Sequence, residues 1–132
     1  MNTVQQIAII SAERKNATAE SNIDRTTLLK GFLSDCNMAY SEAQGFWEGG
    51  SETSLVVIIN NNAELEVVKT FAFENFNQEA ILYQDANQEA YLVSKNDTLE
   101  RLGRLEQVTE LEAKGLNNYT TMNGQHYATV KR

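Results

Sequence analysis

Two short apolar runs, each enclosed by polar sequence, constrain the fold of this chain most. Val4–Ile10 ends in Ile-Ala-Ile-Ile, and Leu55–Ile59 is the longest uninterrupted apolar run. Both are far shorter than the ~20 residues that cross a bilayer, and apolar runs of this length between turn signals are typical of buried strands. We therefore expect two buried strands, over Val4–Ile10 and Thr53–Ile59, and no membrane-spanning segment.

The chain has no proline, so the other boundaries are read from Gly, Asn and Asp clusters and from hydrophobic period. Ser21 is a good N-cap and predicts a helix to about Leu33. Asn60, Asn61 and Asn62 predict the start of a second helix over about Ala63–Phe76. The further elements that we predict are strands at Met38–Trp47, Ala80–Gln84, Glu89–Ser94 and Leu99–Gln107, a short helix at Glu110–Lys114, and a hairpin of Tyr119–Met122 and Gln125–Val130 around Asn123-Gly124.

The first elements follow the order β-α-β-β-α-β, which is that of the ferredoxin-like fold. With 132 residues and no internal repeat, the chain has the size of one domain. The sequence thus predicts a single α+β domain over residues 1–132, a ferredoxin-like sandwich with extra strands and a hairpin at its C-terminal end.

Charge and cysteine content exclude several function classes. The net charge of −7 argues against a nucleic-acid binder, because phosphate neutralisation supplies most of that affinity. The single cysteine, Cys36, allows no internal disulfide and no cysteine zinc site, and we interpret it as a small core residue. The first ten residues lack the basic and apolar regions of a secretory signal, so we expect a cytoplasmic location.

Standard catalytic signatures are missing: the sequence has no GxGxxG, Walker loop, HExxH or GxSxG motif. The one histidine, His126, falls in the terminal hairpin and is interpreted as a surface or rim residue. No clustered Asp/Glu pattern predicts a metal site. From motifs alone, the chain is a soluble α+β domain.

Three local features are unusual. A long polar loop, 11–21, leaves a buried strand and enters a helix, which is where backbone N–H groups and a helix N-terminus can face an anionic group. The cluster Phe46–Glu52 places aromatic rings beside carboxylates, which suits an organic cation. Gln78 stands between the second helix and the next strand. Each also has a plain structural interpretation: a solvated connection, a turn with a structural tryptophan, and a polar residue at a strand start.

Together these features resemble the phage-encoded S-adenosylmethionine (SAM) lyases, formerly called SAM hydrolases. The similarity covers nearly the whole chain. The residues that carry it are Ser11-Ala12 after an apolar strand, Asn22-Ile23-Asp24-Arg25 opening a helix, Glu52 before the strand at Leu55–Ile59, the segment 75–83 with Gln78, and the terminal hairpin. The family has a tyrosine shortly before its glutamate, where this chain has Phe46-Trp47. Tyr40 lies further back on the same predicted strand.

The resemblance implies a trimer of ferredoxin-like subunits, similar to the signalling protein PII, with SAM bound between neighbours. It also implies an intramolecular reaction, in which the substrate carboxylate attacks Cγ and expels 5′-methylthioadenosine, leaving homoserine lactone. Such a reaction needs no metal, cofactor or protein nucleophile. Holding carboxylate and carbon in a near-attack pose contributes on the order of 7–11 kcal/mol. A water nucleophile would also have to be deprotonated, and no general base pair is evident.

On this resemblance, Glu52 is the candidate catalytic residue, expected to anchor the methionine amino group or oppose the sulfonium. Ser11 and the loop that it opens, with Ala12 and Ser21, are expected to hold the carboxylate or ribose. Tyr40 and Trp47 are candidates for packing on the adenine or sulfonium, worth roughly 0.5–2 kcal/mol as a cation–π contact. Gln78 either organises the site or is purely structural.

Two other function classes remain open. A PII-like sensor or sequestering protein would bind a nucleotide or SAM without chemistry, because function belongs to sites rather than folds. A phage inhibitor would act by protein contact through an acidic surface, although Lys and Arg are interspersed with the acids and no block of five like charges occurs. Formation of methylthioadenosine from SAM separates the enzyme from both.

Overall fold

The computed structural model of the chain describes residues 4–47, 50–116 and 118–131. Within them the strands are β1 (Gln6–Ile10), β2 (Tyr40–Trp47), β3 (Gly50–Ile59), β4 (Ala80–Gln84), β5 (Glu89–Ser94), β6 (Leu99–Val108), β7 (Tyr119–Met122) and β8 (Gln125–Val130). The helices are α1 (Ala19–Asp35), α2 (Asn62–Thr70), the π-helix η1 (Phe71–Asn75) that continues α2, and α3 (Glu110–Lys114). No helix in the described residues is long and apolar enough to cross a membrane.

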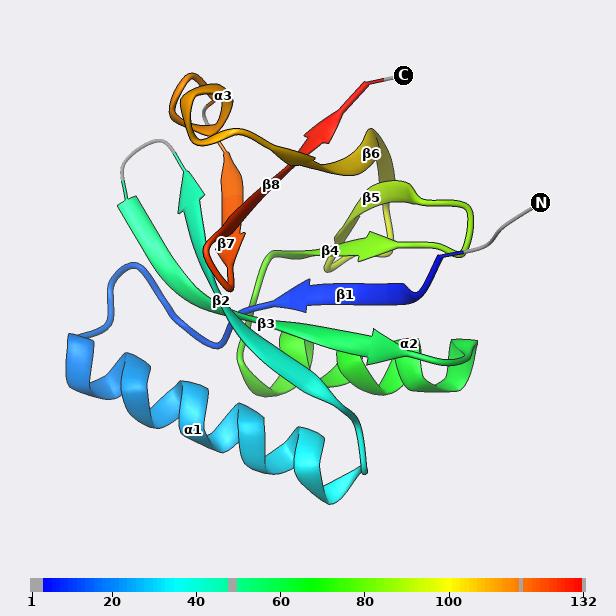
Figure 1. Ribbon diagram of the computed structural model, residues 1–132. Helices are drawn as coiled ribbons and strands as arrows, with labels where there is room; N and C mark the ends of the chain where they lie inside the picture. The colour runs from blue at the N-terminus through cyan, green and yellow to red at the C-terminus, as the bar shows by residue number, and fades with distance from the viewer. Residues whose placement is uncertain (1–3, 48–49, 117, 132) are drawn as a thin grey trace.

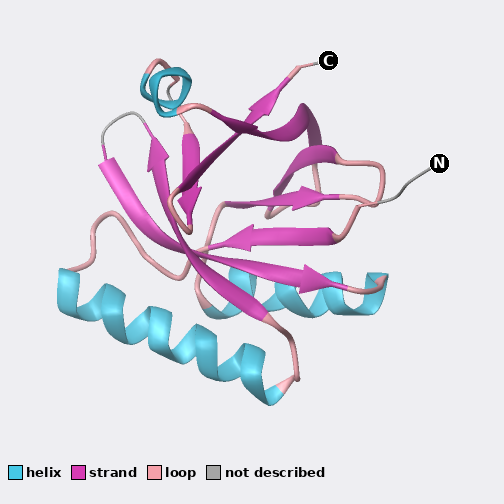
Figure 2. Ribbon diagram, in the orientation of Figure 1, coloured by secondary structure: helices cyan, strands magenta, loops and turns pink. Residues whose placement is uncertain are grey.

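The strands form one closed antiparallel barrel in the order β1-β3-β2-β7-β8-β6-β5-β4. Helices α1 and α2 lie on the same side of the barrel, against β1 and β3, and α3 lies at the far end beside β7 and β8 (Figures 1 and 2). The interior of an eight-stranded barrel is just wide enough to be filled by side chains or to hold one small ligand. The fold therefore has an interior between its strands, which the predicted ferredoxin-like sandwich would not have.

The predicted ferredoxin-like, PII-like sandwich is wrong. The β-α-β-β-α-β elements occur in the predicted order, and β4, β1, β3 and β2 are neighbours. However, the C-terminal strands are not additions to a finished sheet. Strand β5 continues the sheet beyond β4, and β7 pairs with β2 through Gln44↔Thr121, Gly45↔Thr120 and Phe46↔Tyr119. The sheet closes on itself because these late strands pair with both of its edges.

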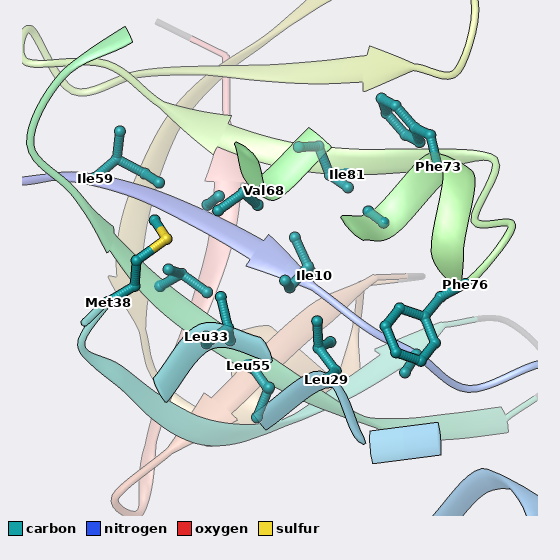
Figure 3. Close-up of a cluster of buried hydrophobic side chains, with 14 of the residues drawn as sticks. Ile10, Leu29, Leu33, Met38, Leu55, Ile59, Val68, Phe73, Phe76 and Ile81 are labelled. Atoms are coloured by element: carbon teal, nitrogen blue, oxygen red, sulfur yellow. The ribbon is translucent and has the colours of Figure 1, made fainter. Parts of the chain in front are cut away.

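The main hydrophobic core lies between the barrel wall and the helices α1 and α2 (Figure 3). Alternate residues of β3, namely Leu55, Val57 and Ile59, point into this core. They meet Leu29 and Leu33 of α1, which are fully buried. Each such side chain contributes about 1.5–3 kcal/mol on leaving water. Since successive side chains of a strand alternate between faces, the residues between them on β3 point into the barrel.

The helix boundaries depend on their caps. Thr18 caps α1 by accepting from the Ser21 backbone N–H at 3.0 Å, so the prediction of Ser21 as N-cap is wrong and the helix starts earlier. Asn61 caps α2 as predicted, accepting from the Glu64 N–H at 2.9 Å. The predicted core position of Cys36 is also wrong: Cys36 follows the last turn of α1 and is exposed.

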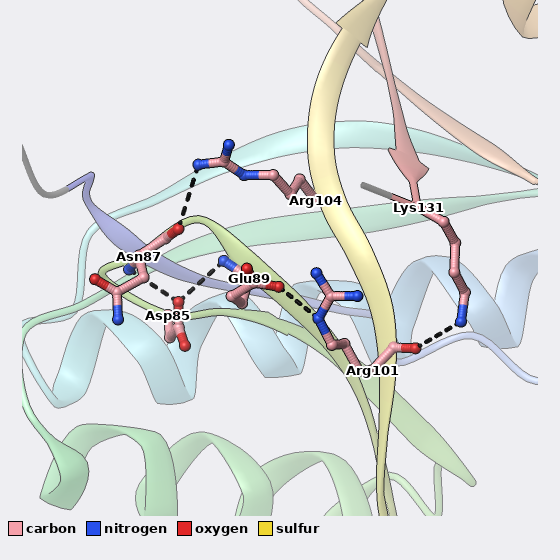
Figure 4. A network of polar contacts seen from close by, with 6 residues as sticks. All are labelled: Asp85, Asn87, Glu89, Arg101, Arg104 and Lys131. Carbon is pink, nitrogen blue, oxygen red and sulfur yellow. Dashed lines mark hydrogen bonds and ion pairs between the residues drawn. The ribbon is translucent and has the colours of Figure 1, made fainter.

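The barrel closes where β5, β6 and β8 meet (Figure 4). Glu89 of β5 pairs with Arg101 of β6 at 2.7 Å, and Lys131 after β8 donates to the Arg101 carbonyl at 3.3 Å. Gly103 lies at the register shift between β5 and β6, with a φ of +111°. A Cβ at this position would lie 2.2 Å from the Val130 carbonyl oxygen. Only glycine therefore lets β6 pass this close to the end of β8.

Candidate functional site

The site lies at the end of the barrel where β1 leaves and β3 enters. Strand β1 pairs with β3 up to Ile10↔Leu55, so Ser11 emerges beside the first half of β3. The Ser11 hydroxyl donates to the Thr53 carbonyl at 3.0 Å, and the Thr53 N–H donates to Glu13 Oε2 at 2.9 Å. Glu52 precedes Thr53 and points to the other face of the strand, into the barrel. Long-range strand pairing thus brings Ser11, Glu13 and Glu52 together.

Two cavities meet at Glu52 and Gln78. The inner cavity, of about 420 Å³, extends into the barrel past Tyr127. The outer cavity, of about 700 Å³, opens under the loop after β1 and is also lined by Arg14 and Lys15. A third, largely apolar cavity of about 350 Å³ continues the barrel interior toward its opposite end. The inner cavity is lined by apolar side chains together with a few polar ones, which is the usual character of a small-molecule site.

Three side chains from other elements hold the loop after β1. Each donates to one of three successive carbonyl groups: Arg25 Nε to Ala12 at 2.6 Å, Gln78 Nε2 to Glu13 at 2.9 Å, and Asn22 Nδ2 to Arg14 at 3.1 Å. Both Arg25 and Gln78 also donate to the Phe76 carbonyl, at 2.5 and 3.3 Å, and the Arg25 guanidinium lies over the Phe76 ring at 5.5 Å. The loop is therefore fastened to α1 and to the segment before β4.

The backbone N–H groups of this loop serve the protein itself. The Glu13 N–H donates to the Ser11 hydroxyl at 3.1 Å, and the Arg14 N–H donates to Asn22 Oδ1 at 2.8 Å. The Ala17 N–H donates to the Arg14 carbonyl. These three groups are thus not directed at the cavity, in contrast to the role that the loop suggested in sequence.

Burial raises the pKa of the Glu52 carboxyl above its ordinary value, and the nearby charge of Glu13 raises it further. A hydrogen bond from Ser11 lowers it and offsets part of this effect. The one Ser11 hydroxyl proton serves either Glu52 or the Thr53 carbonyl at a given time. Glu52 is therefore a carboxylate that gains from a cation in the cavity, because a cation relieves both burial and repulsion.

Two aromatic residues on strands close to Glu52 are among those that line the inner cavity. Phe46 of β2 and Tyr119 of β7 are cross-strand partners, and their rings stack at 4.7 Å between centroids. His126 meets the edge of Tyr119 at 6.0 Å, and its Nδ1 lies 2.7 Å from the Thr121 hydroxyl. Both residues line the cavity, and Phe46 directly follows Gly45, the cross-strand partner of Glu52.

The structure brings together three of the residues expected from sequence, Ser11, Glu52 and Gln78, which all line the inner cavity. Ala12 is buried in the core. Its carbonyl group accepts a hydrogen bond from Arg25, and this is its part in holding the loop. Ser21 lies in the first turn of α1 and lines neither cavity at Glu52. Tyr40 packs against the main core at the other end of β2, where it pairs with Val57.

The Trp47 side chain, Glu48 and Gly49 lie outside the described residues. The aromatic residues that the structure places at the inner cavity are instead Phe46, Tyr119 and Tyr127. Among the described residues, no group of three or more His, Cys, Asp or Glu side chains is placed to hold a metal ion.

Sequence reasoning missed Glu13, Arg25 and Tyr119. Glu13 could have been predicted from the sequence. In an extended chain, the side chain two positions after Ser11 points to the same side of the backbone as Ser11 does. Arg25 and Tyr119 could not have been predicted, since their places depend on contacts with Phe76 and Phe46, which are distant in sequence.

Comparison with known proteins gives one clear relationship. A sequence model of the S-adenosylmethionine lyase family matches residues 8–130, which include the loop after β1, Glu52, Gln78 and the terminal hairpin. No match was found among curated proteins. Because the family match spans nearly the entire chain, the protein belongs to the S-adenosylmethionine lyase family.

Proposed function

We propose that the protein cleaves SAM into 5′-methylthioadenosine and L-homoserine lactone by attack of the substrate's own carboxylate on Cγ. A carboxylate oxygen forms the new bond to Cγ while the Cγ–S bond breaks. The bonding pair moves to sulfur, so the sulfonium becomes a neutral thioether. No proton is transferred, and the α-ammonium stays on the lactone.

The observation that carries this proposal is the meeting of Ser11, Glu52 and Gln78 in one cavity of a chain that belongs to the family. The cavity is large enough for one small molecule, and both a carboxylate and aromatic residues are among the residues that line it. It suits a substrate with a cationic amino-acid end and a flat purine end. The enzyme's main task is then to fold the substrate into a near-attack conformer.

Glu52 anchors the substrate ammonium, and the Ser11 hydroxyl borders the place of the carboxylate. Gln78 acts as a positioning residue, because its amide nitrogen already donates to the Glu13 and Phe76 carbonyls. Phe46 and Tyr119 take the part that we first assigned to Tyr40 and Trp47, that of packing against the nucleoside. Ala12 contributes through its carbonyl, which Arg25 fixes. We assign Ser21 no substrate contact.

A homotrimer with sites shared between neighbours, a cytoplasmic location and a phage origin remain part of this proposal, because the resemblance of the sequence implies them. Light scattering coupled to size exclusion tests the assembly. A monomer that turns over SAM at nanomolar concentration would remove the shared site from the proposal.

The reaction is tested by incubating the protein with SAM in H₂¹⁸O and following products by mass spectrometry. Intramolecular attack gives methylthioadenosine and the lactone first. Later opening of the lactone at its carbonyl places the heavy oxygen in the carboxyl group of homoserine. Direct attack of water on Cγ would place it in the hydroxyl group instead, and would identify a hydrolase. Binding of SAM without methylthioadenosine would identify a sensor or sequestering protein.

A further inference from the structure

Glu13 is held beside Glu52 by contacts from three directions. Its carboxylate accepts from the Thr53 N–H at 2.9 Å, directly after Glu52 in β3. Its own N–H donates to the Ser11 hydroxyl at 3.1 Å, and its carbonyl accepts from Gln78 Nε2 at 2.9 Å. Glu13 is half-buried and lines the outer cavity together with Glu52. The protein thus uses several bonds to keep two carboxylates at one cavity wall.

Two fixed carboxylates repel each other, and the repulsion is visible in the pKa of Glu52, which the charge of Glu13 raises. Arg14 and Lys15 line the same cavity, but in the described residues no ion pair joins either of them to Glu13 or Glu52. A cation between the two side chains would interact favourably with both. The arrangement is therefore suited to a cationic group of the substrate.

SAM has two cationic groups, and the reaction distinguishes them. The sulfonium loses its charge as the C–S bond breaks, so a carboxylate against sulfur would stabilise the substrate more than the transition state and would slow the reaction. The α-ammonium keeps its charge from substrate to lactone. A carboxylate pair on the ammonium therefore binds without opposing the chemistry.

We propose that Glu13 is a specificity-determining residue, which together with Glu52 forms a two-carboxylate site for the α-ammonium of the substrate. This inference rests on the proposed function. In this role Glu13 binds the substrate and the transition state equally well. Removing its charge should therefore raise KM and leave kcat nearly unchanged.

The test compares Glu13→Gln with the wild-type protein on two substrates, SAM and its deamino analogue, which keeps the carboxylate and the sulfonium but lacks the ammonium. Gln at this position can still accept from the Thr53 N–H, so the variant removes the charge and keeps the loop contact. We expect KM for SAM to rise about tenfold, as for the loss of one partly buried ion pair, with kcat within twofold. The analogue should react equally well with both proteins.

The pH profile separates a charge effect from structural damage. Without the Glu13 charge the pKa of Glu52 falls, so the acidic limb of kcat/KM for SAM should move to lower pH. Glu74→Gln is the control, because it makes the same change of charge at an exposed position of η1. It should alter neither KM for SAM nor the pH of the acidic limb of kcat/KM. A fall in kcat, an equal loss on the analogue, or an unmoved limb would overturn the assignment.

A second experiment tests the role of Glu13 separately from the proposed SAM cleavage. If the wild-type protein forms no methylthioadenosine, calorimetric binding of S-adenosylhomocysteine, whose one cationic group is the α-ammonium, tests Glu13 alone. Affinity that falls about tenfold in Glu13→Gln supports the ammonium site in a binding protein, whereas unchanged affinity refutes it.

Discussion

At the scale of single residues, Glu52 shows how a binding role opposes stability. Its pKa is raised by burial and by the charge of Glu13, so the folded state holds the ionised carboxylate less favourably than the unfolded chain does. The resulting destabilisation is absent at acid pH, where Glu52 is protonated in both states. It grows as the pH rises toward the raised pKa and is complete above it.

We predict that Glu52→Gln lowers kcat/KM for SAM by about 10- to 100-fold, as expected for loss of a hydrogen bond to a charged group. The same variant should have a higher thermal midpoint than the wild-type protein at pH 7, and the difference should close as the pH falls. Calorimetric scans across pH measure this. A variant that is less stable at pH 7 would contradict the electrostatic cost assigned to Glu52.

At the scale of elements, the loop after β1 is held in place by side chains of other elements as well as by its own hydrogen bonds. Arg25 on α1 makes two hydrogen bonds, to the Ala12 and Phe76 carbonyls, and lies over the Phe76 ring. The planar guanidinium can make both bonds at once, whereas a lysine ammonium on a flexible stem cannot reproduce this geometry.

We predict that Arg25→Lys lowers the free energy of unfolding by about 1–3 kcal/mol and raises KM for SAM, because the loop that carries Glu13 then keeps only its connection to α1 through Asn22. Urea unfolding and steady-state kinetics measure the two effects. Lys30→Gln on the same helix breaks an exposed pair with Glu42 and should change stability by less than about 1 kcal/mol. Equal effects of the two variants would argue against the fastening role of Arg25.

At the scale of the whole molecule, barrel closure depends on the close approach of β6 to the end of β8. Gly103 has a positive φ, and a Cβ there would overlap the Val130 carbonyl. We predict that Gly103→Ala lowers the free energy of unfolding by more than about 2 kcal/mol, since it adds both steric overlap and backbone strain. Chemical denaturation measures the loss.

Gly31→Ala is the matched control, because Gly31 lies in α1 and a Cβ there would meet nothing within 4 Å. Alanine favours the helix, so this variant should be about 0.5–1 kcal/mol more stable. If both glycines tolerate alanine, closure of the barrel does not depend on the contact at Gly103.

The sequence by itself determined the local elements. Strands β4 and β5, helix α3 and the β7–β8 hairpin lie where turn signals and hydrophobic period predict them, with Asn123 and Gly124 at φ values of 53° and 77° in the turn. These features depend on interactions between residues a few positions apart, which a linear pattern records. The choice of Thr18 over Ser21 as the cap of α1 was missed, because both are good cap residues and packing of the whole helix selects one.

Only the tertiary structure decided that the sheet closes and which residues share the cavity. Pairing of β2 with β7 joins segments that are far apart in the sequence, and no periodicity in either strand specifies its partner. The same limit applies to the site. The family resemblance predicted Ser11, Glu52 and Gln78, but Glu13, Arg25 and Tyr119 acquire their places through contacts with Thr53, Phe76 and Phe46, which form only when distant strands are paired.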